Sequence, residues 1–462
     1  PASDLSGAWQ AGTTVASFDL SDPTRPIARE TLRYPGSGNV VTATDQFLFV
    51  AVTDYSRDWP WRSDLHLVDI SAPDGTLVRF ASVPLAGRVA DKFKINLFDG
   101  VLRVVVESME SAKGNVWVTV LETYRVADPR SAAPQAVIPL DRLELAHGER
   151  LFGTRFDGQR AYIVTFLRID PLWIVDLSDP ADLKIAGELE IPGWSTYLHP
   201  MGDRLLTLGV DDSRGWRVAV QLFDVGDPAR PRLLSKVALG ENSSWSEATS
   251  DEKAFGVHPE SGLVLVPVSE WATDSSKQGV QIVDLNRDTL VKRGFLGSQD
   301  VVPRRAALHG DQLVAVSSRQ LLVADLADRD RPQTAGSLEL AYPVERVVLA
   351  GGYRLEFSGS TLRVVPVSPE GANPVRSVDL GSLPVRGVSL RGGRLHVAAS
   401  KGAVVDWRSV GPSGEWQAYT NAGTLVVSSW DLSALPEVRK LGEAKTETLD
   451  TGWTDLEPLW RD

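Results

Sequence analysis

The stretch Leu172-Trp-Ile-Val-Asp-Leu-Ser-Asp-Pro180 joins a short apolar run to a Ser-Asp-Pro turn. Close copies occur at Val15-Ala-Ser-Phe-Asp-Leu-Ser-Asp-Pro23 and Val220-Gln-Leu-Phe-Asp-Val-Gly-Asp-Pro228, and weaker copies follow at intervals of roughly 40 to 65 residues. Short apolar runs bounded by turn signals predict β-strands. Asp accepts backbone N–H bonds in its own turn, and Pro ends a strand because it cannot donate to the ladder. We therefore interpret Ser-Asp-Pro as a turn and not as a calcium site.

A second repeated element lies between these copies and consists of two strands joined by a tight Asp/Gly turn. Examples are Phe156-Asp-Gly-Gln-Arg-Ala-Tyr-Ile-Val164 and Leu308-His-Gly-Asp-Gln-Leu-Val-Ala-Val316. Asp and Gly suit turn positions that need a positive φ. Together the two elements make four strands per repeat, which is typical of a β-propeller blade.

The number of blades follows from the two kinds of strand pair. Inner pairs are expected to start near eight residues: Val40, Val89, Leu151, Ser195, Ala248, Ala306, Arg346 and Val388. Outer pairs number nine, and the first covers residues 13–34. A ring removes its open sheet edge when one terminus completes the blade that the other begins. We therefore predict an all-β, eight-bladed propeller closed by pairing of the N- and C-terminal segments. Seven blades is the alternative, if one degenerate repeat is not a blade.

Composition limits the classes of function. The 462 residues include 48 Lys and Arg against 60 Asp and Glu, a net charge of −12. Nucleic-acid binding needs clustered basic residues, so we do not expect a nucleic-acid partner. No apolar run reaches the ~20 residues of a transmembrane helix. The absence of Cys excludes disulfides, thiolate zinc sites and a Cys nucleophile. Because the sequence begins with Pro1 and not Met, we expect that a preceding segment, such as a signal peptide, lies out of view.

Two longer stretches carry a family resemblance: Gly148-Glu-Arg-Leu-Phe-Gly-Thr-Arg-Phe156 and Gly187-Glu-Leu-Glu-Ile-Pro-Gly-Trp-Ser-Thr-Tyr-Leu-His-Pro200. With the repeat between them, they resemble the secreted β-propeller domain family of bacteria and archaea, over residues 88–326. Farther on only the blade pattern is similar, and residues 403–422 read as an inserted hairpin or loop. We expect one propeller domain over 1–445 and a C-terminal tail over 446–462. The resemblance implies an exported protein of the cell surface, periplasm or extracellular space, and it implies no activity.

Tryptophans gather in connections that are predicted to share one face of the propeller. These connections join the second and third strands of a blade, or one blade to the next, and the residues concerned are Trp59, Trp61, Trp194, Trp216, Trp245 and Trp271, with Trp407 and Trp416 in the insertion. Trp is enriched at binding hot spots. We predict that they form a binding face for a protein or polysaccharide partner. The alternative is that the rings pack onto the tops of the blades.

A charged set is expected near the inner strands and hence near the central channel: Lys92, Arg155, Arg304, Arg305 and Arg346. Because inner strands converge, these side chains and neighbouring carboxylates are expected to satisfy one another as a channel lining. The alternative is an anion site on Arg155, Arg304 and Arg305, since guanidinium groups recognise carboxylates bidentately.

Catalytic motifs have little support in the sequence. None of the six histidines has the spacing of a helical zinc site, and no Gly-x-Ser-x-Gly elbow occurs. We predict no metal, no cofactor and a non-catalytic binding or scaffold function. The alternative is a glycan- or ester-acting hydrolase or lyase at the channel mouth, with Glu149, Tyr197, His199 and Glu247 as its candidate residues. That alternative fails if Tyr197, His199 and Glu247 are buried and mutually satisfied.

Overall fold

The computed structural model describes residues 12–448, apart from short gaps at 23, 54, 56–59, 111–113, 131–134, 167–169, 192, 214, 272–275, 299–301, 370–372, 403 and 411–414. The chain divides into two compact units, Pro1–Leu338 and Glu339–Asp462. Both are built from antiparallel sheets, and the described residues contain 3-10 turns but no α-helix. The prediction of an all-β chain is confirmed for these residues.

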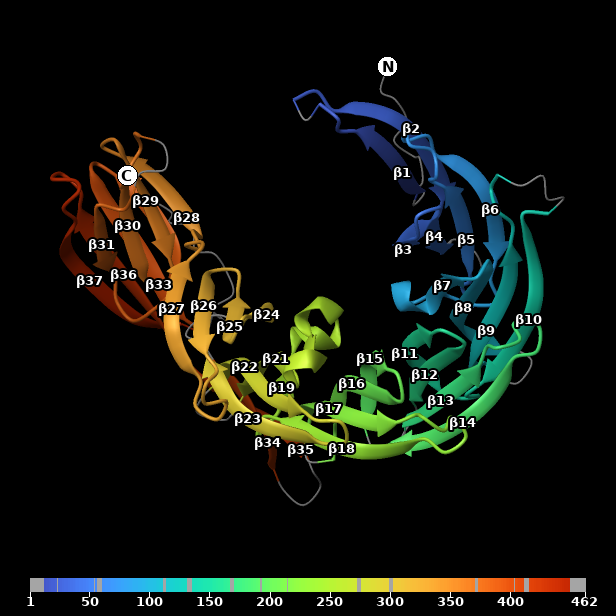
Figure 1. Ribbon diagram of the computed structural model, residues 1–462. Coiled ribbons are helices and arrows are strands. Elements are labelled where there is room, and N and C mark those ends of the chain that lie inside the picture. The colour runs from blue at the N-terminus through green and yellow to red at the C-terminus, as the bar shows by residue number, and fades with distance from the viewer. Residues whose placement is uncertain are drawn as a thin grey trace. The chain divides into compact units, whose positions relative to one another are not determined.

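The first unit is a series of sheets whose strands are, with few exceptions, neighbours both in sequence and in space (Figure 1). It begins with a two-stranded sheet of β1 (Gly12–Asp19) and β2 (Ile27–Pro35). Three four-stranded sheets follow: β3 (Ser37–Ala43), β4 (Phe47–Thr53), β5 (Ser63–Asp69) and β6 (Val78–Pro84); β7 (Ile95–Phe98), β8 (Val101–Glu110), β9 (Val116–Val126) and β10 (Val137–Leu145); β11 (Arg150–Asp157), β12 (Arg160–Phe166), β13 (Asp170–Asp176) and β14 (Lys184–Ile191).

Three further sheets complete this unit. The first is β15 (Trp194–Met201), β16 (Arg204–Asp211), β17 (Arg217–Asp224) and β18 (Arg232–Leu239). The second has five strands: β19 (Ser244–Trp245) and β20 (Gly256–His258) both pair with β21 (Leu263–Trp271), which continues to β22 (Ser276–Leu285) and β23 (Leu290–Gly297). The third is β24 (Arg305–His309), β25 (Gln312–Val316), β26 (Gln320–Asp325) and β27 (Gln333–Glu339).

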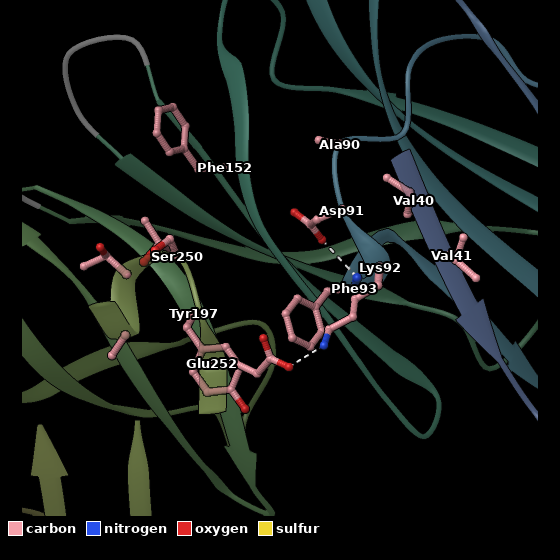
Figure 2. Close-up of a pocket in the computed structure, with 13 residues that line it drawn as sticks. Val40, Val41, Ala90, Asp91, Lys92, Phe93, Phe152, Tyr197, Ser250 and Glu252 are labelled. Atoms are coloured by element: carbon pink, nitrogen blue, oxygen red, sulfur yellow. Dashed lines mark hydrogen bonds and ion pairs between the residues drawn. The ribbon is translucent and has the colours of Figure 1, made fainter. Parts of the chain in front are cut away.

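Short 3-10 turns replace part of the inner strands expected near Val89 and Ala248. These turns are η1 (Lys92–Lys94), η3 (Glu247–Thr249) and η4 (Glu252–Ala254), and η5 (Pro259–Ser261) follows β20. The side chains of Asp91, Ser246 and Asp251 cap the first three turns by accepting bonds from backbone N–H groups two residues on. Figure 2 shows Asp91 beside η1 and Glu252 in η4. The expected strands are shorter than predicted because these capping side chains compete with the sheet ladder for backbone N–H groups.

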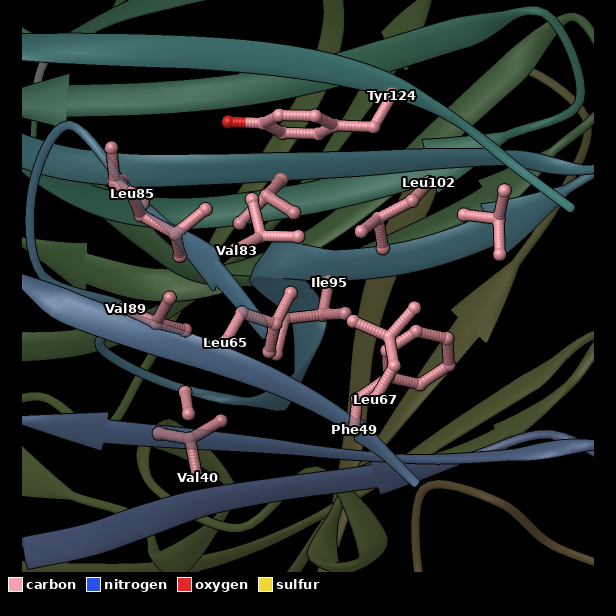
Figure 3. Close-up of a cluster of buried hydrophobic side chains, with 14 of the residues drawn as sticks. Val40, Phe49, Leu65, Leu67, Val83, Leu85, Val89, Ile95, Leu102 and Tyr124 are labelled. Carbon is pink, nitrogen blue, oxygen red and sulfur yellow. The ribbon is translucent and has the colours of Figure 1, made fainter. Parts of the chain in front are cut away.

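The core of the first unit lies between consecutive sheets. Figure 3 shows one cluster, in which Phe49 and Leu67 of the β3–β6 sheet pack with Ile95 and Leu102 of the β7–β10 sheet. Similar clusters join each later sheet of the unit to the next. Complete burial of one such apolar side chain contributes about 1.5–3 kcal/mol. Face-to-face packing of consecutive four-stranded sheets is the arrangement that the repeat predicts for propeller blades.

The Asp residues that end the repeated strands close their own turns. Asp176 Oδ1 accepts from Ser178 N at 2.9 Å, Asp224 Oδ1 from Gly226 N at 3.1 Å and Asp325 Oδ1 from Ala327 N at 2.7 Å. The Asp that precedes Pro does the same, because Asp179 Oδ1 accepts from Ala181 N at 2.9 Å and Asp227 Oδ1 from Ala229 N at 3.1 Å. The interpretation of Ser-Asp-Pro as a turn is confirmed.

The second unit contains two four-stranded sheets with one cluster between them, in which Phe357 and Leu395 take part. One sheet is β28 (Arg346–Ala350), β29 (Tyr353–Ser358), β30 (Thr361–Pro366) and β31 (Arg376–Asp379); the other is β32 (Val385–Arg391), β33 (Arg394–Lys401), β36 (Gly423–Asp431) and β37 (Arg439–Thr448). A hairpin of β34 (Val404–Val410) and β35 (Glu415–Asn421) interrupts the second sheet between β33 and β36.

The described pairing bears on how the predicted ring would close. β1 pairs with β2 alone, and β37 completes the last four-stranded sheet beside β36. The described residues therefore contain no backbone pairing between N- and C-terminal strands. Eight blades and a shared closing blade stay predictions, as does one domain over 1–445. None of the helical turns in the described part of the chain has the length or hydropathy to cross a membrane.

Candidate functional site

A polar cavity of about 530 Å³ lies where the inner segments of five consecutive sheets of the first unit meet (Figure 2). We call it the axial cavity, and its lining residues are Val40, Val41, Ala90, Asp91, Lys92, Phe93, Phe152, Thr196, Tyr197, Ala248, Thr249, Ser250 and Glu252. The turns η1, η3 and η4, together with their cap residues Asp91 and Ser250, supply seven of these thirteen residues. Lys92 and Tyr197, both predicted to lie near the channel, belong to it.

Ion pairs hold most of the charged groups at this cavity. Lys92 Nζ donates to Glu252 Oε1 (Figure 2). The two residues are 160 positions apart in the chain and lie in the turns η1 and η4, which precede strands of different sheets. Lys94 is fully buried, and its Nζ donates to Asp91 Oδ2 at 2.5 Å and to the Phe152 carbonyl oxygen at 2.9 Å. Burial lowers the pKa of Lys94, an effect that Asp91 opposes. Of the predicted channel residues, Lys92 is thus already paired with a carboxylate.

The predicted arginines do not converge on one anion site. Arg305 Nη2 lies 2.6 Å from Asp251 Oδ2, and Arg304 Nε lies 3.5 Å from Glu247 Oε2. Arg155 instead stacks its guanidinium 5.1 Å from the centre of the Phe93 ring. Arg346 begins β28 in the second unit. Two of the three arginines of the predicted anion site therefore already face carboxylates, and the third lies over an aromatic ring.

The residues of the hydrolase alternative fall into separate sets of contacts. Tyr197 and His199 lie together, with 6.3 Å between their ring centroids. Burial is the main cause that lowers the pKa of His199, and the positive charge of Arg155 lowers it further. Glu247 faces Arg304. Glu149 accepts a hydrogen bond from Thr165 in the β11–β14 sheet. Tyr197, His199 and Glu247 are each half-buried, so the condition that would exclude the hydrolase or lyase is not met and it stays an alternative.

Four predicted tryptophans gather where the β15–β18 sheet meets the five-stranded sheet. Trp194 is 8% exposed, and its ring packs against those of Phe152, Phe166 and Trp216. Trp216, Trp245 and Trp271 are 54%, 40% and 52% exposed. We call Trp194, Trp216, Trp245 and Trp271 the tryptophan cluster. The expectation that Trp194 is presented to a partner is wrong, because it forms the packed base beneath Trp216.

Backbone hydrogen bonds tie the three exposed tryptophans to one short segment. Ser244 N donates to the Trp216 carbonyl oxygen at 2.8 Å, and Trp271 N donates to the Ser243 carbonyl oxygen at 3.0 Å. Trp245 pairs with Ser269 in the same sheet. Trp245 and Trp271 are therefore the last residues of β19 and β21, and Trp216 directly precedes β17.

A second pocket on the same kind of connections surrounds Trp61. It has a volume of about 290 Å³, and its lining residues are Tyr55, Pro60, Trp61, Arg88, Glu107, Ser108, Met109, Trp117 and Arg150. We call it the aromatic pocket. Trp61 and Tyr55 are exposed and meet edge to face, with 5.0 Å between ring centroids. Trp59 lies outside the described residues, as do the side chains of Trp407 and Trp416.

Sequence reasoning missed the partners of Trp61 in this pocket. Trp117 was not among the predicted site residues, yet Arg150 places its guanidinium 4.3 Å from the centre of the Trp117 ring. Glu107 accepts from Arg150 Nε at 2.5 Å and from Arg150 Nη2 at 3.1 Å. The sequence signal that could have found this site is Glu107 directly after the apolar residues Val104–Val106 of β8, since a buried charge there needs a partner.

One cluster near this pocket offers ligands of the kind that bind metal ions. The side-chain donor atoms of Glu110, Glu144 and His147 lie within 4.8 Å of one another. Glu144 also accepts from Arg142, and His147 Nδ1 lies 3.3 Å from Glu110 Oε1. Glu144 and His147 are exposed, so their mutual arrangement is also that of ordinary surface ion pairs.

Comparisons with known proteins agree with this architecture. A model of the family described as "Beta propeller domain" matches residues 5–329. A relative from Methanocaldococcus jannaschii, described as an uncharacterised protein, is 42% identical over 111 residues, which are 24% of this chain and 17% of the relative. Another from Archaeoglobus fulgidus, also described as uncharacterised, is 32% identical over 216 residues, 46% of this chain and 32% of the relative. The matches thus span less than a third of the length of these curated relatives.

Solved structures similar to this chain are distant in sequence. Sqt1 of Saccharomyces cerevisiae is 7% identical, with a TM-score of 0.38 over 85% of this chain and 93% of that one. A protein from Lactobacillus plantarum is 11% identical, with a TM-score of 0.38 over 70% of this chain and 90% of that one.

Proposed function

This chain belongs to the beta propeller domain family, and on that premise we propose that it is a non-catalytic binding module that captures a protein or polysaccharide partner through the tryptophan cluster. The propeller fold supports a general binding or scaffold role. We extend the proposal to the location of the protein: it is exported and works at the cell surface, in the periplasm or outside the cell.

The observation that carries the proposal is the partial exposure of Trp216, Trp245 and Trp271 on segments that backbone hydrogen bonds join to one another. Indole rings supply a large contact area with few rotatable bonds and are enriched at binding hot spots. Because backbone pairing already holds the segments that bear these rings, little ordering entropy is lost when a partner binds. These features favour recognition by a rigid face.

The axial cavity supports a non-catalytic role. A general acid or base must be able to reach the substrate and exchange a proton with it. Glu252 and Glu247 instead face Lys92 and Arg304. Although burial opposes the change, the hydrogen bond from Lys92 lowers the pKa of Glu252, which favours its charged, paired form.

The test uses the full chain with both exposed rings of the five-stranded sheet removed, Trp245→Ala and Trp271→Ala. The purified chain, carrying a photo-crosslinking tag, is mixed with an envelope fraction of the source cells and irradiated. The masses and yields of the cross-linked products are then compared between wild type and variant. We expect the yield of the product seen with wild type to fall at least tenfold in the double variant, since truncation of a hot-spot residue costs about 2 kcal/mol or more of binding free energy. Its melting temperature should stay within a few degrees of wild type, because exposed substitutions change stability little.

The matched control is Phe98→Ala. Phe98 is an aromatic residue of similar exposure, 41%, at the turn between β7 and β8, the opposite end of its sheet from the tryptophan-bearing connections. The control should cross-link like wild type. Equal loss in control and double variant, or no loss in either, would refute the tryptophan cluster as the binding face.

A further inference from the structure

We propose that the aromatic pocket binds a uronate, the carboxylate-bearing sugar ring of an acidic saccharide. The pocket shares no residue with the tryptophan cluster, so the inference does not rest on the proposed function. It is carried by the charge, the fixed geometry and the ring faces of the described lining residues.

The charge of the lining favours an anion. Two guanidinium groups, those of Arg88 and Arg150, face one carboxylate, that of Glu107, and the other lining residues are uncharged. The pocket wall therefore carries one excess positive charge, in a chain whose net charge is −12. The side chains of Arg150 and Arg88 keep 49% and 33% of their surface exposed, whereas Glu107 keeps 5%. A ligand thus meets guanidinium groups and not the carboxylate beneath them.

The guanidinium of Arg150 is fixed before a ligand arrives. Two hydrogen bonds hold it to Glu107, and the ring of Trp117 lies 4.3 Å from it. Glu107 is itself positioned by the backbone N–H of Leu151, which donates to it at 3.3 Å. A planar fork whose orientation is set by packing loses little entropy on binding and suits the two oxygens of a carboxylate.

The ring faces favour a sugar over an extended peptide. Trp61 and Tyr55 meet at an interplanar angle of 78°, so they present two faces at a steep angle in place of one long groove. The C–H face of a pyranose stacks on an indole while its hydroxyl groups stay hydrated. The volume of about 290 Å³ is at the lower end for ligand pockets, and it suits one ring of a saccharide.

The test compares two ligands whose carboxyl groups are either free and charged or methyl-esterified and neutral. A galacturonate trisaccharide and its methyl ester are titrated into the full chain by isothermal calorimetry at low salt. The acid should bind at least tenfold more tightly than the ester, because a charge-assisted hydrogen bond is lost in the ester. Comparable affinity for both ligands would overturn the proposal. So would tighter binding of a short peptide with a free C-terminal carboxylate, which would assign the pocket to a protein partner.

Two variants locate the binding. Arg88→Gln and Trp61→Ala change partly exposed side chains, and each should lower the affinity for the acid trisaccharide at least tenfold. Trp271→Ala, in the tryptophan cluster, should leave that affinity unchanged. Unchanged affinity in both pocket variants would refute the pocket as the site. Loss in Trp271→Ala alone would place the saccharide on the tryptophan cluster, refuting this inference while supporting the proposed function. The comparison of acid with ester uses wild-type protein, so it decides the question even if a variant folds poorly.

Discussion

The buried carboxylate of Glu107 gives the sharpest prediction for stability. Glu107→Gln keeps the shape of the side chain and removes its charge. The wild-type group accepts two hydrogen bonds from Arg150, at 2.5 and 3.1 Å, and lies 4.0 Å from Arg88 Nη2. Hydrogen bonds to charged groups contribute about 1.5–3 kcal/mol, against about 1 kcal/mol for neutral ones. The two bonds from Arg150 go to different carboxylate oxygens, and a Gln amide keeps only one acceptor oxygen. One bond is therefore lost and the other becomes neutral, which together should cost about 2–3 kcal/mol.

The loss should stay below the 3–5 kcal/mol typical of breaking a fully buried pair. Arg150 is half-exposed, so water can hydrate the guanidinium that Glu107 releases. The measurement is the urea midpoint of the full chain followed by tryptophan fluorescence, with near-ultraviolet circular dichroism to check that the native fold is kept.

Glu144→Gln is the matched control. Glu144 lies in the same β7–β10 sheet and pairs with Arg142 at 2.7 Å, but both side chains of that pair are exposed. Exposed pairs contribute about 0–1 kcal/mol, so this variant should unfold close to wild type. If Glu107→Gln costs no more than Glu144→Gln, the buried ion pair does not stabilise this sheet and the reasoning from burial is wrong.

Two further predictions concern the support of the tryptophan cluster. A Cβ at Gly209 would lie 1.8 Å from a carbonyl oxygen of the facing strand, so Gly209→Ala should force β15 and β16 apart and lower the free energy of unfolding in urea by about 3 kcal/mol or more. Gly297→Ala, with open space around the new Cβ, should lower it by under about 0.5 kcal/mol. Equal losses would contradict the close approach at Gly209. Burial alone would raise the pKa of Asp211, but hydrogen bonds from Ser213 and Lys236 outweigh it and lower that pKa to about 2. A carboxyl whose pKa is lowered in the folded state stabilises the fold above its ordinary pKa, and this stabilisation is lost as the pH falls toward 2. The difference in unfolding free energy between wild type and Asp211→Asn should therefore shrink from pH 5 to pH 2. A constant difference would contradict the lowered pKa of Asp211.

The sequence was informative where local chemistry repeats. The Asp at the end of most repeated strands accepts a hydrogen bond from its own turn, so Asp176 and Asp224 could be assigned without knowledge of the fold. The order of strands followed from the hairpin turns, because adjacent strands are neighbours along the chain.

Contacts between distant residues could not be predicted in the same way. The Lys92–Glu252 pair depends on two capped turns in different sheets, and neither turn has a hydrophobic period that marks it. Trp194 and Trp216 look alike as connection residues, yet one is buried and the other exposed. The difference arises because Phe152 and Phe166 lie beneath Trp194, and they come from another sheet.

The sharing of each apolar cluster by two consecutive sheets has a consequence for folding. Leu102 of the β7–β10 sheet packs toward the preceding sheet, and Val105 of the same strand belongs to the cluster shared with the following one. A single sheet therefore has no complete core of its own and gains stability from its nearest neighbours, as in linear repeat proteins. A substitution that disrupts one cluster should destabilise the two adjoining sheets most, and its effect should be smaller in each sheet farther along the chain.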